Sequence, residues 1–336
     1  MALSVLLSTS PRFLEHDAGR GHPERPARLG AVLDGARRGE LADAVLLVEP
    51  RPATRDELAA VHPLAFLDAL ERFCAAGGGD LDPDTAVVPA SWAAALLAAG
   101  AGLDAIDRLL AGEGDAAFCA VRPPGHHATP TRAMGFCLLN NVAVAAATLA
   151  GRGERVLVVD WDAHHGNGTQ DAFWTDGRVL YVSLHQFPLY PGTGRLDDVG
   201  EGDGAGSTIN VPLPAGATGD VYLAALDEVV APAVEAFAPG WLLVSAGYDA
   251  HRADPLTGLG LTSGDFAAFT QKVLDYAPPG RRLFFLEGGY DLAALEDSTA
   301  ATVSVLAGEE HRPEPSTAGG PGSDAVRAAA ALRSER

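Results

Sequence analysis

The sequence predicts an α/β domain in three layers, with a central, mainly parallel sheet between helices. Short, continuously apolar runs alternate along the chain with longer stretches of helical character. A continuous apolar run is typical of a strand covered on both faces, and strands that alternate with helices favour parallel pairing. The chain has 336 residues, of which 47% are hydrophobic and 20% charged, so it can bury a large core.

The expected elements follow one another in a regular order. Buried strands are expected at Val5–Leu7, Val45–Val48, Ala117–Val121, Val156–Asp160, Val179–Leu184, Leu242–Ser245 and Leu283–Leu286. Helices are expected at Asp56–Cys74, Trp92–Leu110, Leu138–Ala150, Val221–Phe237, Phe266–Tyr276 and Leu292–Leu306. Near residue 308 the composition turns to Gly, Pro, Ser and charge, and the Ala-rich segment Ala325–Arg333 follows. We expect one domain over residues 1–307 and a flexible tail over 308–336, with room for a short surface helix.

Charge and cysteine content narrow the class of protein. The formal net charge of −20 repels nucleic-acid phosphates and favours cationic partners, so direct nucleic-acid binding is not expected. Cys74, Cys119 and Cys137 are odd in number and lie among apolar neighbours, which indicates buried thiols in a reducing compartment. The start of the chain lacks a signal-peptide pattern, and no apolar run reaches the roughly 20 residues of a membrane span. We expect a cytoplasmic protein without membrane contact, and a homo-oligomer stays open.

Polar residues follow several of the expected strands directly. These segments are Arg122–Ala128, Asp160–Asn167, Ala246–Asp249 and Glu287–Tyr290. In open α/β sheets, ligands bind beyond the carboxyl ends of the strands. The side chains of these segments are therefore expected to meet above one edge of the sheet.

A metal site is indicated within these segments. Asp162 and His164 are two residues apart, a spacing that points both side chains to the same side of an extended segment. Asp249 follows another strand and completes a set of one histidine and two carboxylates with an open coordination position. That set suits Zn²⁺, with Fe²⁺ as an alternative. An Asp-x-His pair alone is more often structural, and it is the conjunction with the other motifs that favours a metal site.

Taken together, these motifs resemble the histone deacetylase family, which includes bacterial deacetylases, acetylpolyamine amidohydrolases and acetoin-utilisation proteins. The likeness extends from Gly21 to about Ala307, so that residues 1–307 would form the catalytic domain of an arginase/deacetylase-like fold. The matching segments are Gly21–Pro26, Arg122–Ala128, Gly135–Asn141, Val159–Gly168, Ser183–His185, Pro191–Gly194, Ser245–Leu256 and Leu286–Leu292.

The resemblance implies a role for each site residue. It makes Asp162, His164 and Asp249 the zinc ligands, His126 and His127 the catalytic pair, and Tyr290 the donor to the transition state. His127 is our choice of general base, and His126 then holds or delivers a proton to the leaving amine. Asp160 is expected behind the first histidine and Asn167 behind the second. An Asn at that position resembles class II rather than class I deacetylases.

The resemblance also outlines a substrate channel and a second ion. Gly135 and Phe136 match the channel wall, and Tyr190 is a candidate for the opposite wall, with ordinary core packing as the alternative for both aromatic residues. Leu256 stands where some polyamine-specific relatives carry an acidic residue, which favours acyl-lysine or other acylated amines. A structural potassium site would be formed by Asp160, Asp162, His164, Ser183 and Leu184. Asp82 and Asp84 could grip a substrate backbone, but a charged loop is the simpler interpretation.

The sequence thus predicts a zinc-dependent deacetylase that acts on acetyl-lysine or a similar acylated amine. Hydrolysis of acetylpolyamines is the nearest alternative, because the acidic chain would attract polyamines. An arginase-type ureohydrolase needs another carboxylate soon after Asp-x-His, but Gly166 and Asn167 stand there. A zinc-containing module that binds acyl groups without turnover is a further alternative, and the filled catalytic positions argue against it.

Overall fold

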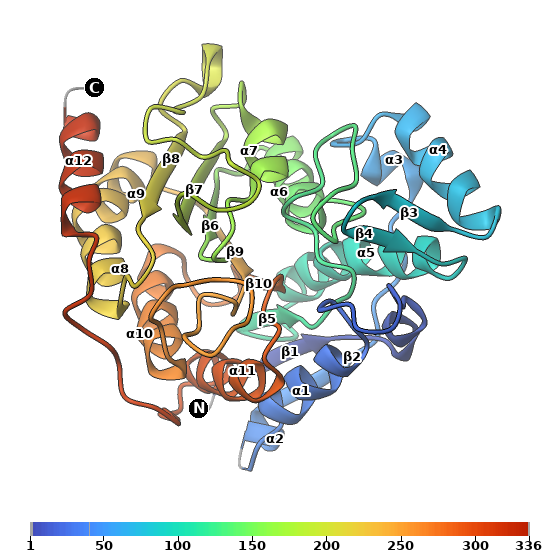
Figure 1. Cartoon of the computed structure of the whole chain (residues 1–336), viewed down its shortest axis with the longest axis horizontal. Helices are drawn as coiled ribbons and strands as arrows, with labels where there is room; N and C mark the ends of the chain where they lie inside the picture. The colour runs from blue at the N-terminus through green and yellow to red at the C-terminus, as the bar shows by residue number, and fades with distance from the viewer. Residues whose placement is uncertain (1–2, 40, 335–336) are drawn as a thin grey trace.

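A computed structural model describes residues 3–39 and 41–334 of the chain. Its centre is an eight-stranded sheet in the order β2-β1-β5-β10-β9-β6-β7-β8, in which every neighbouring pair is parallel (Figure 1). The strands are β1 Val5–Ser8, β2 Val45–Val48, β5 Ala116–Cys119, β6 Val156–Asp160, β7 Val179–Gln186, β8 Thr208–Leu213, β9 Trp241–Ala246 and β10 Arg282–Leu286. The expected three-layer α/β fold with a parallel sheet is confirmed.

Helices cover the sheet on both sides. On one side α5 packs against α6, and both contact sheet strands; on the other, α11 packs against α1 and α10 (Figure 1). The helices are α1 Ala27–Ala36, α2 Leu41–Ala44, α3 Arg55–Leu58, α4 Leu64–Ala75, α5 Ser91–Leu110, α6 Asn141–Gly151, α7 Asn167–Phe173, α8 Gly219–Ala225, α9 Ala231–Phe237, α10 Ser263–Val273, α11 Leu292–Leu306 and α12 Ser323–Ser334. Within the described residues, no helix combines the length and the apolar character that crossing a bilayer requires.

Proline explains where two expected helices are interrupted. The stretch Asp56–Cys74 divides into α3 and α4 because Pro63 lacks an amide hydrogen and disfavours helical geometry at His62. The stretch Val221–Phe237 contains a π-helical turn at Leu226–Val230 between α8 and α9. Pro232 lies at the start of α9, where the ladder of amide hydrogen bonds has to change.

The edges of the sheet differ from the expectation. Strand β2 was expected to be buried on both faces, but Leu46 is 47% and Leu47 59% exposed. This expectation was wrong because β2 pairs only with β1 and lies at the border of the sheet, where neighbouring layers end. The opposite border, β8, was not predicted, since Asn210 and Pro212 interrupt its apolar pattern. A two-stranded hairpin, β3 Gly79–Asp82 with β4 Thr85–Val87, was also unforeseen.

The register of the central strands places their carboxyl ends at one level. Asp160 on β6 pairs with Ser183 on β7 and Ser245 on β9, and Leu286 on β10 pairs with Ala246. The preceding residues of β6 and β9 are fully buried apolar side chains. Burial of each such side chain stabilises the fold by about 1.5–3 kcal/mol. Packing of these apolar side chains therefore fixes the strand ends relative to one another, and with them the starting points of the polar segments.

The segment expected to form a flexible tail lies along the body of the domain. The expected surface helix is α12, whose Val326 and Ala329 are buried. Ahead of it, Glu314 accepts hydrogen bonds from His251 Nε2 and Arg252 Nη2, each at 2.7 Å. The Glu314 carboxylate also accepts from the backbone N–H of Ser263 at the start of α10. The segment around Glu314 is thus attached to the loop that follows β9 and to the start of α10, while α12 packs against β8 and α8.

We expect Glu314→Ala to lower the free energy of unfolding by about 1–3 kcal/mol at neutral pH, because hydrogen bonds to a charged carboxylate are lost. Burial opposes ionisation, but His251, Ser263 and Arg252 lower the pKa of Glu314 from 4.5 to about 2. The stabilisation is therefore complete above pH 4.5 and disappears as the pH falls toward 2. Urea unfolding at several pH values measures it, with Glu309→Ala, an exposed neighbour, as control. Equal stability of both variants would contradict the attachment.

Candidate active site

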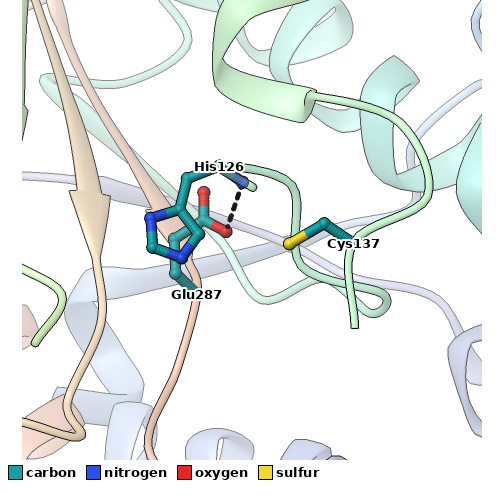
Figure 2. A group of neighbouring side chains, drawn as sticks. All are labelled: His126, Cys137 and Glu287. Carbon is teal, nitrogen blue, oxygen red and sulfur yellow. Dashed lines mark hydrogen bonds between the residues drawn. The ribbon is translucent and has the colours of Figure 1, made fainter. Parts of the chain in front are cut away.

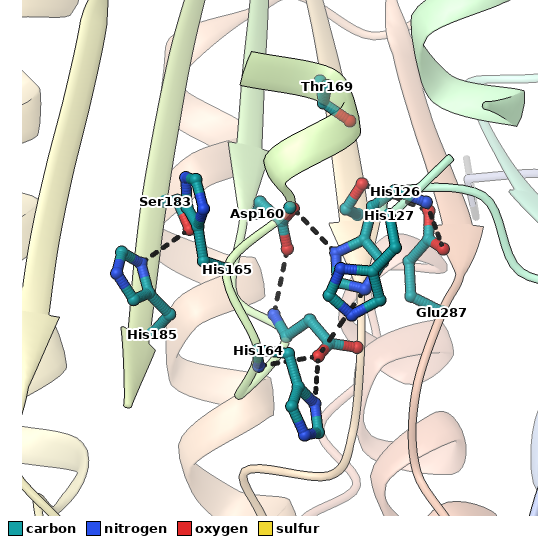
Figure 3. A network of polar contacts seen from close by, with 12 residues as sticks. His126, His127, Asp160, His164, His165, Thr169, Ser183, His185 and Glu287 are labelled. Atoms are coloured by element: carbon teal, nitrogen blue, oxygen red, sulfur yellow. Dashed lines mark hydrogen bonds and ion pairs between the residues drawn. The ribbon is translucent and has the colours of Figure 1, made fainter. Parts of the chain in front are cut away.

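The polar segments after the central strands meet in one place. His126 and His127 follow β5, Asp162 and His164 follow β6, Asp249 follows β9 and Tyr290 follows β10. Figure 3 shows the His126–His127 pair beside Asp160 and His164 at the ends of the strands. A cavity of about 220 Å³ opens above them, lined by Asp84, His127, Gly135, Phe136, His164, Leu189, Tyr190, Leu256 and Tyr290.

Asp162, His164 and Asp249 form a compact group of potential metal ligands. Their ligand atoms all lie within 4.8 Å of one another, and His164 Nδ1 is 2.8 Å from Asp249 Oδ2 and 3.2 Å from Asp162 Oδ1. Burial lowers the pKa of His164, but the carboxylates of Asp249 and Asp162 outweigh it and raise the pKa to about 10. Two buried carboxylates this close require a compensating cation. The donor set of one nitrogen and two carboxylates suits a divalent metal ion.

Two glycines make room for these carboxylates. A Cβ atom at Gly247 would lie 2.0 Å from Asp162 Oδ2, and one at Gly288 would lie 2.3 Å from Asp249 Oδ2. The Gly288 N–H donates to Asp162 Oδ2 at 2.7 Å. Because any larger residue would displace the carboxylates, the glycines of both motifs serve the ligand group directly.

The two histidines after β5 have different partners. His126 Nδ1 is 3.1 Å from Asp160 Oδ2, and His127 Nδ1 is 2.9 Å from Asn167 Oδ1. Burial opposes a charge on His126, but Asp162 and Asp160 raise its pKa to about 10. Burial and the neighbouring His126 and His164 hold the pKa of His127 well below its ordinary value. The two imidazole rings, whose centroids are 4.0 Å apart, thus have pKa values shifted in opposite directions.

Aromatic side chains form the walls of the cavity. The Phe136 ring meets the Tyr290 ring edge to face at 5.7 Å, and the Tyr190 ring meets the His127 ring at 5.2 Å. Tyr190 is 38% exposed, so it lies at the mouth of the cavity and not in the core. Gly135 has φ 56°, and a Cβ atom there would lie 2.5 Å from the His127 ring. Gly135 therefore permits the close approach of the wall to the histidine.

The residues expected around a potassium ion come from β6, from the segment that follows it and from β7. Asp160 and Ser183 are register partners on β6 and β7, and Leu184 follows Ser183 in the same strand. The Asp160 carboxylate accepts from Tyr181 Oη at 3.2 Å and from the backbone N–H of Asp162 at 3.2 Å. Ser183 Oγ forms a hydrogen bond with His185 Nδ1. Asp160 and Ser183 thus lie side by side on adjacent strands, while Asp162 and His164 stand in the segment after β6.

The roles of several buried polar residues of the site were not assigned from the sequence. Arg28 donates to the carbonyl oxygens of Gly289 and Glu287, and its guanidinium lies 4.9 Å from the Tyr290 ring centroid. Asp254 accepts the backbone N–H of Tyr290 at 2.8 Å. Glu287 belongs, with His126 and Cys137, to a second cluster whose potential ligand atoms lie within 4.8 Å of one another (Figure 2). A carboxylate directly after a buried strand was the available indication for Glu287.

Comparison with known proteins agrees with this geometry. The histone deacetylase domain matches residues 22–306. A probable deacetylase of Archaeoglobus fulgidus is 39% identical over 303 residues, which cover 88% of this chain and 84% of that protein. A histone deacetylase-like amidohydrolase of Pseudomonas aeruginosa is 41% identical over 305 residues, covering 88% and 80%. The crystal structure of the HDA15 HD domain superposes with a TM-score of 0.91 at 38% identity, over 99% of this chain and 95% of that one.

These matches define an enzyme of the hydrolase class that acts on amide bonds. More narrowly, the chain belongs to the histone deacetylase domain family, as its motifs predicted.

His62 supports the cavity wall through a titratable ring. Its Nε2 accepts the N–H of Asn140 at 2.9 Å, and its Nδ1 lies 3.1 Å from the carbonyl oxygen of Pro130. These contacts fix both ends of the segment that carries Gly135 and Phe136. Burial lowers the pKa of His62 from 6.5 to about 4.

We therefore expect His62 to make the fold less stable as the pH falls from 6.5 to about 4, because only the unfolded chain binds the proton in that window. The effect reaches roughly 3 kcal/mol. Chemical unfolding of the wild type and of His62→Gln across this pH range measures the difference. A pH dependence of stability that is identical in both proteins would refute it.

Proposed function

We propose that the protein is a metal-dependent deacetylase that hydrolyses the amide of acetyl-lysine or of a similar acylated amine. The observation that carries this proposal is the meeting of three groups at one cavity. They are the ligand set of Asp162, His164 and Asp249, the His126–His127 pair, and Tyr290. Membership of the histone deacetylase domain family supports the same chemistry.

Asp162, His164 and Asp249 would hold Zn²⁺, with Fe²⁺ as the alternative ion. When bound, the ion supplies a Lewis acid that polarises the amide carbonyl and lowers the pKa of water from about 15.7 toward about 7. Asp160, Asp162, His164, Ser183 and Leu184 would hold K⁺ as a structural ion.

His127 acts as the general base. Its Nδ1–H donates to the Asn167 amide oxygen, which leaves the Nε2 lone pair free to accept a proton. The low pKa of His127 keeps the ring neutral before reaction. As water attacks the carbonyl carbon, its proton passes to His127. Asn167 orients the ring without adding the negative charge that an aspartate would bring.

His126 provides a proton for the leaving amine. Asp160 lies against its Nδ1 and favours the imidazolium form, and this contribution does not depend on the metal ligands. When the C–N bond of the tetrahedral species breaks, the amine nitrogen takes the proton from His126 and leaves as the neutral amine, while the acyl group leaves as the carboxylic acid. The acid then ionises in water, and before the next turnover His127 releases the proton it took from water and His126 regains one. Asp160 therefore positions and charges His126.

Tyr290 stabilises the oxyanion. Tyr290 lines the cavity, and its ring is held between Phe136 and the guanidinium of Arg28. Its backbone N–H is held by Asp254. Burial raises the pKa of Tyr290 well above its ordinary value, so the hydroxyl stays protonated and donates to the developing charge.

The cavity favours a slender acyl-amine chain. Gly135, Phe136 and Tyr190 offer flat and apolar walls against which methylenes pack. Leu256 at the mouth is 38% exposed and offers no carboxylate to a distant ammonium group. Asp84, however, also lines the cavity, and this observation keeps acetylpolyamines as the second candidate substrates. The family match argues against an arginase-type ureohydrolase.

The proposed function is tested with a panel of acyl-lysine peptides, acetylpolyamines and small acetylated amides. We expect one equivalent of divalent ion per chain, turnover of at least one acylated amine, loss of activity on chelation and recovery with Zn²⁺ or Fe²⁺. Asp249→Ala should lose the bound ion, measured by elemental analysis. Activity that survives complete metal removal would exclude the mechanism.

Tyr290→Phe removes one hydroxyl and keeps the ring packing. We expect kcat to fall by about two to three decades, the typical loss for one oxyanion donor, while metal content stays at the wild-type value. Steady-state kinetics and elemental analysis of the same preparation test both statements. Turnover near that of the wild type would remove Tyr290 from the mechanism.

A further inference from the structure

The loop that carries the histidine pair has an unusual shortage of backbone donors. It begins with Arg122-Pro123-Pro124, and the two prolines have no amide hydrogen. Gly125 and His126 supply the next N–H groups, and both residues are buried. Within the described residues, no backbone carbonyl accepts from either of them. A buried N–H without an acceptor costs about 1–3 kcal/mol, so these two groups need a partner.

Glu287 is that partner. One carboxylate oxygen, Oε2, accepts the N–H of Gly125 at 2.7 Å and the N–H of His126 at 3.1 Å. Figure 2 shows the carboxylate of Glu287 directed at the main chain of His126. Glu287 is fully buried and does not line the cavity, so its carboxylate faces the main chain of the loop and not the substrate.

Glu287 is itself held on several sides. Its other oxygen, Oε1, accepts the hydroxyl of Ser245 at 3.2 Å. Its backbone N–H donates to Ala246, and its carbonyl oxygen accepts Arg28 Nη2. Ser245 and Ala246 end the central strand β9. Glu287 therefore connects the histidine loop to the end of this strand, and the sheet fixes where the loop lies.

The peptide units around His126 are consequently fixed from both directions. Glu287 accepts the N–H of His126, while the carbonyl oxygen of His126 accepts the N–H groups of Gly168 and Thr169 in α7. The backbone at His126 determines where both imidazole rings stand, since His127 is the next residue. A displacement of about 1 Å at a reacting group can cost about a hundredfold in rate.

We propose that Glu287 is a positioning residue for the His126–His127 pair. Its side-chain carboxylate accepts hydrogen bonds from the main-chain N–H groups of their loop and so holds the loop against the sheet. This inference rests on the proposed function, because it expects the position of the histidine loop to change the rate of the proposed reaction. The role requires an acceptor oxygen at the distance of a glutamate side chain and does not require a negative charge. Gln offers that oxygen, Asp is one methylene too short, and Ala offers none.

Three variants separate these requirements. We expect Glu287→Gln to keep kcat within about threefold of the wild type, and Glu287→Asp and Glu287→Ala to lose at least about tenfold in kcat with KM changed much less. Hydrogen exchange should show faster exchange at Gly125 and His126 in the Asp and Ala variants and wild-type protection in the Gln variant. Kinetics use whichever acylated amine the wild type turns over.

Asp115→Ala is the matched control. Asp115 accepts the backbone N–H of Ser4 at 2.9 Å at the opposite, amino-terminal edge of the sheet. Its loss should lower Tm and leave kcat and the exchange at Gly125 unchanged.

The outcomes are distinct. Glu287→Gln as impaired as Glu287→Ala would overturn the acceptor role and assign the effect to charge. Wild-type kcat and protected amides in Glu287→Asp would overturn it as well, and this comparison decides even where Glu287→Ala does not fold. A wild type inactive on every acylated amine would instead overturn the proposed function, and amide exchange would still decide whether Glu287 seats the loop.

Discussion

Two carboxylates and a histidine buried within contact of one another are the constraint on which the rest of the site depends. Asp162 and Asp249 repel each other in a medium where charge is poorly solvated, so they stay together only if the surrounding chain holds them and a cation compensates them. The glycines at 247 and 288 give them space, and the Gly288 amide gives Asp162 a donor. Segments that are far apart in the sequence thus act together to hold two buried carboxylates close to each other.

A second group of buried charged side chains lies beneath the site and holds the loops of the site in position. Glu24 is fully buried between Arg28 and Arg122, and these contacts together with His16 outweigh burial and hold its pKa well below the ordinary value. Arg122 begins the histidine loop, and Arg28 reaches the loop of Tyr290. One carboxylate therefore links the loop of the histidine pair to the loop of Tyr290. Such a network adds little net stability, but it allows few alternative arrangements of its members.

The sequence predicted the site better than the borders of the fold. Continuous apolar runs identified the central strands, and polar residues at their ends identified the residues that meet, because parallel strands in register end at one level. Local pattern failed at β8, where Asn210 and Pro212 break the apolar run, and at β2, where only the neighbouring strand tells an edge from the interior. The hydrogen bond between Glu287 and Gly125 joins residues that are remote in sequence, and no local sequence pattern predicts it.

The packing of residues 308–334 bears on what the boundary of a domain means. The family match stops at residue 306, yet Glu314 contacts the loop after β9 and α12 buries apolar side chains against the body of the fold. The family model marks the part of the chain that its members share. The unit that folds cooperatively, by contrast, includes every segment whose removal exposes a surface that it covered. In this molecule the packed unit therefore extends beyond the family model, and the match to the HDA15 HD domain over 99% of this chain indicates that a relative shares this extension of the fold.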